Sequence, residues 1–344
     1  MFLTGRQTAM TIKEITDILS DPASASWLFQ KADEIRRLHC GDDIHVRGII
    51  EFSNICKRNC LYCGLRAKNA KVRRYRLTES EIVKAALAAA ALDIRTLVLQ
   101  SGEDVYFDVK RLCSIIRVLK KETGAAVTLS VGERTRDEYA AFKKAGADRF
   151  LLRFETSDPG LFAMLKPDSS FENRFNCLKW LREAGFQVGS GIMTGVPGQS
   201  FKILAGDLLR FQELNLDMVG IGPFIPHPDT PLGPAPGCSI DLALKAVALT
   251  RLLTLNAHIP ATTAIGTVDP LGRQKALRCG ANVIMPNVGP LEYREDYAIY
   301  PDKICVSDTS ENCAACVNSI IAGLGRTRAA GPGHTLKASG PVPR

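Results

Sequence analysis

The sequence has no long hydrophobic run, and this absence limits the kinds of protein it can encode. No apolar stretch approaches the ~18 residues that a membrane-spanning helix requires, so we expect no membrane association. The first residues, MFLTGRQTAMTIKEITDIL, do not follow the basic-then-apolar order of a secretory signal. Hydrophobic residues make up 46% of the 344 positions and charged residues 23%, which is typical of a soluble globular chain.

A series of interleaved aromatic residues is also missing where the chain is most basic, so we expect no nucleic-acid binding. A solvated surface is the preferred interpretation of that basic group, with an anion or partner contact as the alternative. The group consists of Lys68, Lys71, Arg73, Arg74 and Arg76. Residues 326–344 hold four basic residues and no acidic one, and so carry +4 of the net charge of +8. Because they are rich in Gly, Pro and Ala, we expect a disordered basic tail there.

Cysteine, in contrast, is abundant. The chain contains 11 cysteines, an odd number, and we expect no export signal. A chain of this length does not need disulfide bonds to fold, so we expect a reducing, cytoplasmic location. Clustered cysteines in that setting indicate metal or redox chemistry.

Short apolar runs alternate with longer helix-like stretches along the chain. Near-continuous apolar strands are expected of a parallel sheet that is covered by helices. The pattern therefore predicts an α/β fold, a complete (β/α)8 TIM-type barrel. An open doubly wound sheet is the alternative, but no G-x-G-x-x-G follows the first strand. The expected strands are 44–53, 96–102, 126–132, 149–156, 187–195, 217–223, 259–264 and 282–287.

The predicted barrel divides the chain into four parts. A helical extension occupies 1–43, the barrel 44–300, a C-terminal cysteine-bearing segment 301–325 and the tail 326–344. In such barrels the chemistry lies where strands end and loops begin. Polar and glycine residues stand at those ends, which a packed core does not require. Among the helices, Thr78-Glu-Ser-Glu81 fits a capping box.

Three cysteines follow the first expected strand at once. Cys56, Cys60 and Cys63 have the spacing C-x3-C-x2-C, and Tyr62 precedes the last of them. A [4Fe–4S] cluster that is held by three thiolates keeps one iron open for a ligand, whereas structural zinc usually has four protein ligands. The alternatives are a zinc loop with a distant fourth ligand and buried free cysteines. The position directly after the first strand favours the open cluster.

The cysteine motif on a repeated β/α chain resembles the radical S-adenosylmethionine (radical SAM) superfamily. Over residues 27–325 the chain resembles the HydE family of [FeFe]-hydrogenase maturases more specifically, in stretches such as IIEFSN, CLYCGLR, VLQSGED, GIGPFIPHPDTPL and ANVIMPN. The resemblance implies that the open iron binds SAM and that one electron cleaves it to a 5′-deoxyadenosyl radical. It also implies a small iron substrate of the Fe(CO)2(CN)–cysteine type, delivered by the companion maturase HydG.

The resemblance assigns roles to individual residues. Cys56, Cys60 and Cys63 are expected to hold the cluster. Residues expected to contact SAM are Tyr62, Gln100, Glu103, Ser130, Glu155 and Arg174. Glu155 and Arg174 have plainer alternatives, a helix-capping carboxylate and a surface cation. The usual GGE after the second strand reads Ser101-Gly102-Glu103 here. Residues expected to line the substrate cavity are Arg153, Met218, Thr262, Thr263 and Tyr293.

A second group, Cys305, Cys313 and Cys316, predicts a surface metal site, with an accessory [2Fe–2S] or [4Fe–4S] cluster as its implied occupant. Expected partners are HydG, a HydF-type scaffold and a reducing electron donor, and the default oligomeric state is a monomer. A radical mutase of the methylornithine synthase type is the alternative enzyme. Biotin synthase fits less well, because no strand end carries a further thiol. An iron–sulfur electron carrier or a zinc scaffold is the alternative from a different class.

Overall fold

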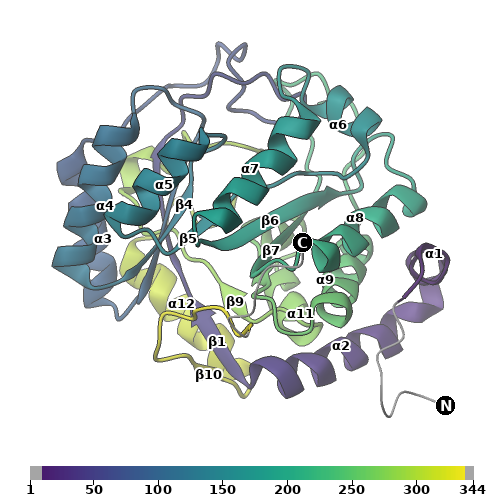
Figure 1. Cartoon of the computed structure of the whole chain (residues 1–344). Helices are drawn as coiled ribbons and strands as arrows, with labels where there is room; N and C mark the ends of the chain where they lie inside the picture. The colour runs from purple at the N-terminus through teal and green to yellow at the C-terminus, as the bar shows by residue number, and fades with distance from the viewer. Residues whose placement is uncertain (1–9, 338–344) are drawn as a thin grey trace.

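The strands of the chain form a closed parallel barrel in the computed structural model, which describes residues 10–337 (Figure 1). The first barrel strand is split at Arg47 into β1 and β2, and the strands β3 to β9 supply the other seven positions. Their bounds are β1 Asp43–Val46, β2 Gly48–Ser53, β3 Thr96–Ser101, β4 Ala126–Ser130, β5 Arg149–Leu151, β6 Gln187–Thr194, β7 Met218–Pro223, β8 Pro260–Ala261 and β9 Val283–Ile284.

Strand pairing closes this barrel completely. Strands β2 to β7 pair in chain order, and β8, β9 and β1 form a second run. Parallel bridges between Met218 and His258 and between Ile49 and Asn287 join the two runs. The predicted complete barrel is therefore confirmed, and the open doubly wound sheet is excluded because no edge is left at either junction.

Helices cover the outside of the barrel, as near-continuously buried strands require. All six residues of β2 and of β7 are buried. The predicted capping box opens α3, because Glu81 N donates to Thr78 Oγ1 (3.2 Å) and Thr78 N donates to Glu81 Oε2 (2.7 Å). The helix bounds are α3 Glu79–Ala91, α4 Val109–Thr123, α5 Arg136–Ala145, α6 Pro159–Leu165, α7 Phe171–Glu183, α8 Phe201–Glu213, α9 Ile240–Thr254, α10 Thr263–Val268 and α11 Gly272–Arg278.

The N-terminal extension is helical, as its sequence indicates. It consists of α1 (Ile12–Ser20), a short 3-10 turn η1 (Pro22–Ser24) and α2 (Ala25–Cys40), and it packs on α8 and α9 (Figure 1). The buried Lys245 of α9 donates to the carbonyl oxygens of Ile18 (3.2 Å) and Asp21 (2.6 Å). These bonds satisfy carbonyl groups that a helix end leaves free, and they fix the extension on the barrel.

The C-terminal part differs from the expected disordered tail. After η2 (Leu291–Tyr293) and α12 (Ser310–Gly323), the short strand β10 (Thr327–Arg328) pairs with β1. The chain then crosses the amino-terminal ends of the barrel strands, where Arg149 donates to the carbonyl oxygens of Pro332 (2.8 Å) and Gly333 (2.9 Å). Arg47 also donates to Gly333 (3.2 Å). Residues 326–337 are thus ordered, and residues 338–344 lie outside the described part.

The physical reason lies in the two arginines rather than in the composition of the tail. Both are buried inside the barrel floor, and buried guanidinium groups need acceptors. The carbonyl oxygens of a Gly/Pro-rich segment supply them. Glycine is required at position 333, because an added Cβ would lie 2.5 Å from His45 Nδ1 and the φ of Gly333 is +61°. Within residues 10–337, no helix is both long and apolar enough to cross a membrane.

Candidate active site

The cysteine loop lies over the carboxyl-terminal mouth of the barrel, directly after β2. Arg74 holds its backbone together: its Nη1 donates to the carbonyl oxygens of Asn54 (2.7 Å) and Leu65 (2.9 Å), and its Nη2 donates to that of Arg66 (2.8 Å). A loop that is fixed by so many bonds to one side chain has a defined shape before any ligand binds.

Gly102, after β3, allows the loop to come this close. A Cβ on Gly102 would lie 2.3 Å from Ile55 O and 2.7 Å from Cys56 Cβ. The next residue, Glu103, donates its backbone N–H to Cys56 Sγ (3.4 Å). The Ser-Gly-Glu sequence therefore keeps the glycine that matters for packing against the cysteine loop.

A cavity of about 360 Å³ connects the cysteine loop with the barrel floor. Cys56, Cys60 and Cys63 line its mouth, and Arg47 and His258 line its deep end. Burial raises the pKa of Cys56, and it raises that of Cys63 to about 12. Uncharged thiols of this kind keep their protons until a metal displaces them.

All of the residues predicted to contact the cofactor line this cavity. They are Tyr62, Gln100, Glu103, Ser130, Glu155 and Arg174. Arg174 is only 4% exposed, so it is not a surface cation. Its Nε donates to Glu133 (2.8 Å), its Nη1 donates to Arg153 O (2.5 Å), and its Nη2 lies 4.0 Å from Glu103 Oε1.

Glu155 has an unusual backbone. Its φ is +67°, in the left-handed region that non-glycine residues rarely adopt. Its carboxylate pairs with Arg153 (2.9 Å) instead of capping a helix. Asp158 caps α6, since its Oδ1 accepts from Leu161 N (2.7 Å). The helix-capping alternative for Glu155 is therefore wrong, because Asp158 is the residue that caps α6. Strained residues of this kind are concentrated at functional sites.

Acidic and basic side chains form one network behind the mouth. Arg58 donates to Glu103 (2.6 Å) and to Glu133 (2.8 Å), and Glu133 also accepts from Arg174. Burial would raise the pKa of Glu133, but the charges of Arg174 and Arg58 outweigh it and the pKa is lowered. Glu133 is therefore ionised and holds both arginines in place.

The predicted substrate residues divide into two groups. Arg153, Met218, Thr262 and Thr263 line the cavity. The Thr262 hydroxyl is already engaged, because it donates to Ile221 O (3.1 Å) and caps α10. Thr263, the first residue of α10, presents the second hydroxyl of the pair.

Tyr293 does not line the cavity, and this prediction is corrected. Its ring stacks on Tyr75 with centroids 4.8 Å apart, and its hydroxyl donates to Glu81 (3.4 Å) on the outer side. Tyr297 and Tyr300 line the cavity instead. The 3-10 turn at Leu291–Tyr293 directs the chain so that the later tyrosines face inward.

Sequence reasoning missed several charged residues of the cavity. Glu51 on β2 accepts from the half-buried Lys303 (2.5 Å) and from Asn287 (2.6 Å), and Glu51 and Asn287 are both buried. A glutamate inside the apolar run IIEFS was a usable signal for Glu51. Lys166 lies beside the cysteine loop, where its Nζ contacts Cys60 Sγ at 3.3 Å. No pattern in the sequence points to it.

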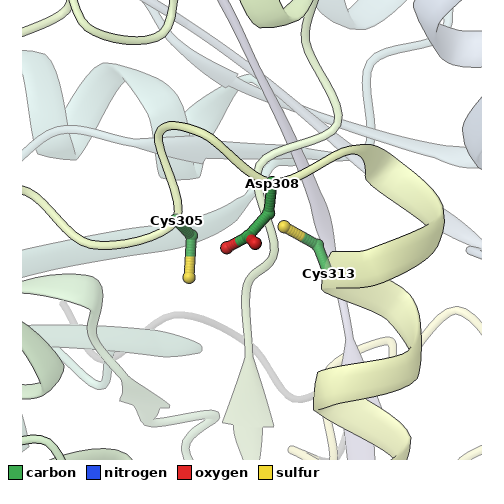
Figure 2. Close-up of side chains that lie close together, drawn as sticks. All are labelled: Cys305, Asp308 and Cys313. Carbon is green, nitrogen blue, oxygen red and sulfur yellow. The ribbon is translucent and has the colours of Figure 1, made fainter.

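The C-terminal cysteines form a separate site at the start of α12. Figure 2 shows the Asp308 carboxylate between the thiols of Cys305 and Cys313, and ligand atoms of these three residues lie within 4.8 Å of one another. A hydrogen bond from the Cys313 thiol lowers the pKa of Cys305 to about 6. Cys316 is exposed and outside this group, so the structure differs from the prediction in the third donor.

The three loop cysteines fit an iron–sulfur cluster with an open iron. They are buried or half-buried, they face a cavity with room for a ligand, and they are the cysteines among its lining residues. The sequence model of the radical SAM superfamily matches residues 50–208, from β2 into α8. The barrel and its cysteine loop thus define a radical SAM enzyme.

A curated [FeFe] hydrogenase maturase subunit HydE from Thermotoga maritima is 52% identical, with 93% of this chain and 91% of that protein aligned. The chain therefore belongs to the HydE family of hydrogenase maturases. Among solved structures, methylornithine synthase (PylB) superimposes with a TM-score of 0.82 at 24% identity, covering 94% of this chain and 95% of its own. The maturase HydG from Carboxydothermus hydrogenoformans gives 0.76 at 21% identity, covering 92% of this chain and 75% of its own. These two similarities confirm the fold.

Proposed function

We propose that this chain cleaves SAM reductively at the cysteine loop and directs the radical at a small iron fragment of the Fe(CO)2(CN)–cysteine type, during assembly of the hydrogenase H-cluster. The observation that carries the proposal is one continuous cavity from Cys56, Cys60 and Cys63 to a floor of Arg47 and Met218. The identity to a curated maturase over nearly the whole chain supports it.

The three cysteines would hold a [4Fe–4S] cluster, and SAM would complete its coordination. When bound, the cluster supplies the electron that breaks the S–C5′ bond of SAM, which gives methionine and a 5′-deoxyadenosyl radical. The chain would orient the reactant: Arg174 would bind the methionine carboxylate, and Glu155 would accept from the ammonium group or ribose. The depth of the site excludes water from the radical.

The charge of the cavity suits an anionic guest. Six basic residues and three acidic ones line it, an excess of three positive charges. The basic residues are Arg47, Arg58, Arg153, Lys166, Arg174 and Lys303. Cyanide and carboxylate groups on an iron fragment would be attracted by this excess, and Thr263 would add a hydrogen bond. The substrate would come from HydG, and the product would pass to a HydF-type scaffold.

Anaerobic reconstitution with iron and sulfide, reduction and addition of SAM test the first step. We expect 5′-deoxyadenosine from the unmodified chain and none from Cys60→Ala. Cys113→Ala is the matched control, because Cys113 is buried in α4 away from the loop. If Cys60→Ala still produced 5′-deoxyadenosine at the rate of the control, the cluster assignment would be wrong.

The substrate needs a separate experiment, because a curated 3-methylornithine synthase is 30% identical over 78% of this chain, which makes an amino-acid mutase the second candidate. We would offer a synthetic cysteine-bound Fe(CO)2(CN) complex and, in parallel, free amino acids. Consumption of the iron complex, seen as a change in its CO and CN infrared bands, supports the maturase. A rearranged amino acid and unchanged bands would support the mutase.

The C-terminal group is proposed as an accessory metal or iron–sulfur site. Cys305, Asp308 and Cys313 supply two thiols and a carboxylate, which suit iron or zinc. The site follows β9, the last strand of the barrel, in the sequence, and its residues are not among those that line the cavity. The 11 cysteines are all unpaired, which supports work in a reducing compartment.

A further inference from the structure

A buried ammonium group lies beside the cysteine loop without a carboxylate partner. Lys166 is 6% exposed. Its Nζ is 3.3 Å from Cys60 Sγ and 3.3 Å from Tyr62 Oη, and it lies 5.7 Å from the centre of the Tyr62 ring. Within residues 10–337 no acidic side chain forms an ion pair with it. The Cys60 sulfur and the Tyr62 hydroxyl are therefore its nearest partners, and of these two the sulfur is the one that becomes anionic when a cluster binds.

Residues on both sides of Lys166 are tied to the same loop. Leu61 N donates to the carbonyl oxygen of Leu165 (2.9 Å), and Asn59 N donates to Asp168 Oδ2 (2.8 Å). Lys166 itself ends α6, where its N–H donates to Phe162 O (2.9 Å). The segment that carries Lys166 is thus held against the loop at residues on either side of it.

Burial of an unpaired ammonium group costs several kcal/mol. The cost is offset if a nearby group carries negative charge when the enzyme is loaded. A thiolate-bound cluster at Cys60 is such a group, since sulfur accepts N–H hydrogen bonds and the cluster becomes more negative on reduction.

We propose that Lys166 donates an N–H···S hydrogen bond to the Cys60 sulfur of the bound cluster and raises the reduction potential of that cluster. This inference rests on the proposed cluster assignment. Reduction adds one electron to the cluster, and no bond breaks and no proton moves. A fixed positive charge stabilises the reduced state more than the oxidised one, so reduction by the cell's electron donor becomes easier. The hydrogen bond to Tyr62 Oη helps to hold the lysine ammonium group next to the Cys60 sulfur.

The test is a redox titration of the reconstituted cluster without SAM, followed by electron paramagnetic resonance. Lys166→Met removes the charge and keeps the length of the side chain, and Lys166→Arg keeps the charge. Lys57→Met is the matched control, because Lys57 is an exposed lysine of the same loop. We expect the reduced-to-oxidised ratio at a fixed potential to fall about tenfold in Lys166→Met, or about 59 mV for one electron. Lys166→Arg and Lys57→Met should stay within about twofold of the unmodified chain.

A second measurement decides the question if Lys166→Met fails to hold iron. When the lysine side chains carry 15N, the resonance of the reduced cluster should show a magnetic coupling to 15N. Lys57→Met, labelled in the same way, should show the same coupling. Absence of that coupling in the unmodified chain would overturn the proposal. An unchanged reduction potential in Lys166→Met would also overturn the proposal. If the potential stayed the same and only the affinity for SAM fell, the lysine would bind SAM and would not tune the cluster.

The two proposals fail in different ways. If the unmodified chain formed no cluster at the loop, the proposed function would fail before Lys166 was tested. If the cluster formed and cleaved SAM, but its potential and 15N coupling did not depend on Lys166, only the present inference would be wrong.

Discussion

Replacement of Gly102 by alanine tests whether the approach of β3 to the cysteine loop sets the geometry of the site. The added Cβ would lie 2.3 Å from Ile55 O and 2.8 Å from Ile55 C, both backbone atoms that cannot rotate away. Ordinary contact begins near 3.4 Å, so the loop that carries Cys56 must shift by about 1 Å. Overpacking of this kind costs about 1–3 kcal/mol, and a displacement of about 1 Å at a reaction centre costs about 10²-fold in rate.

Two assays separate these effects. Chemical denaturation measures the loss of unfolding free energy, and 5′-deoxyadenosine formation by the reconstituted enzyme measures the rate. The matched control is Gly206→Ala in α8, where an added Cβ has no atom within 4 Å. That change should stabilise the chain by about 0.5–1 kcal/mol and leave the rate unchanged. If Gly102→Ala matched Gly206→Ala in stability and in rate, the packing argument would be refuted.

Three further predictions concern groups that lie away from the loop. Lys303→Met removes the cation from the buried carboxylate of Glu51 and leaves it the hydrogen bond from Asn287, so we expect a loss of about 3–5 kcal/mol of unfolding free energy. Lys303→Met combined with Glu51→Gln should recover part of it, and equal losses would contradict the pairing. Burial, and then the charge of Arg47, lower the pKa of His45 from 6.5 to about 4. Because the unfolded chain binds this proton more readily, stability should be complete above pH 6.5 and fall by about 1–2 kcal/mol at pH 5; His45→Gln should reduce that fall in urea titrations, and an unchanged pH dependence would argue against it. Arg149→Met removes donors from two tail carbonyls and should cost about 2 kcal/mol and speed hydrogen exchange in residues 327–337; a chain with unchanged exchange would show that the arginine does not hold the tail.

The sequence predicted the strands of the barrel well because each is a short apolar run with a polar residue at its end. The same reasoning located the cysteine loop and the cavity-lining residues Glu155 and Arg174, since strand ends converge at one mouth. It failed at Tyr293, because spacing does not show which of the three tyrosines in an irregular segment face the cavity. It also failed for residues 326–337, where composition indicated disorder.

The amino-acid sequence by itself determined the parallel barrel, the three thiols at its mouth and the family to which the chain belongs, because local periodicity and motif spacing are properties of neighbouring residues. Only the tertiary structure decided which charges meet. Lys166 reaches Cys60 and Lys303 reaches Glu51 across long intervals of chain, and the two arginines of the floor find carbonyl groups in the tail. Such pairs depend on burial, since a charge that is removed from water must find a partner wherever the fold places one.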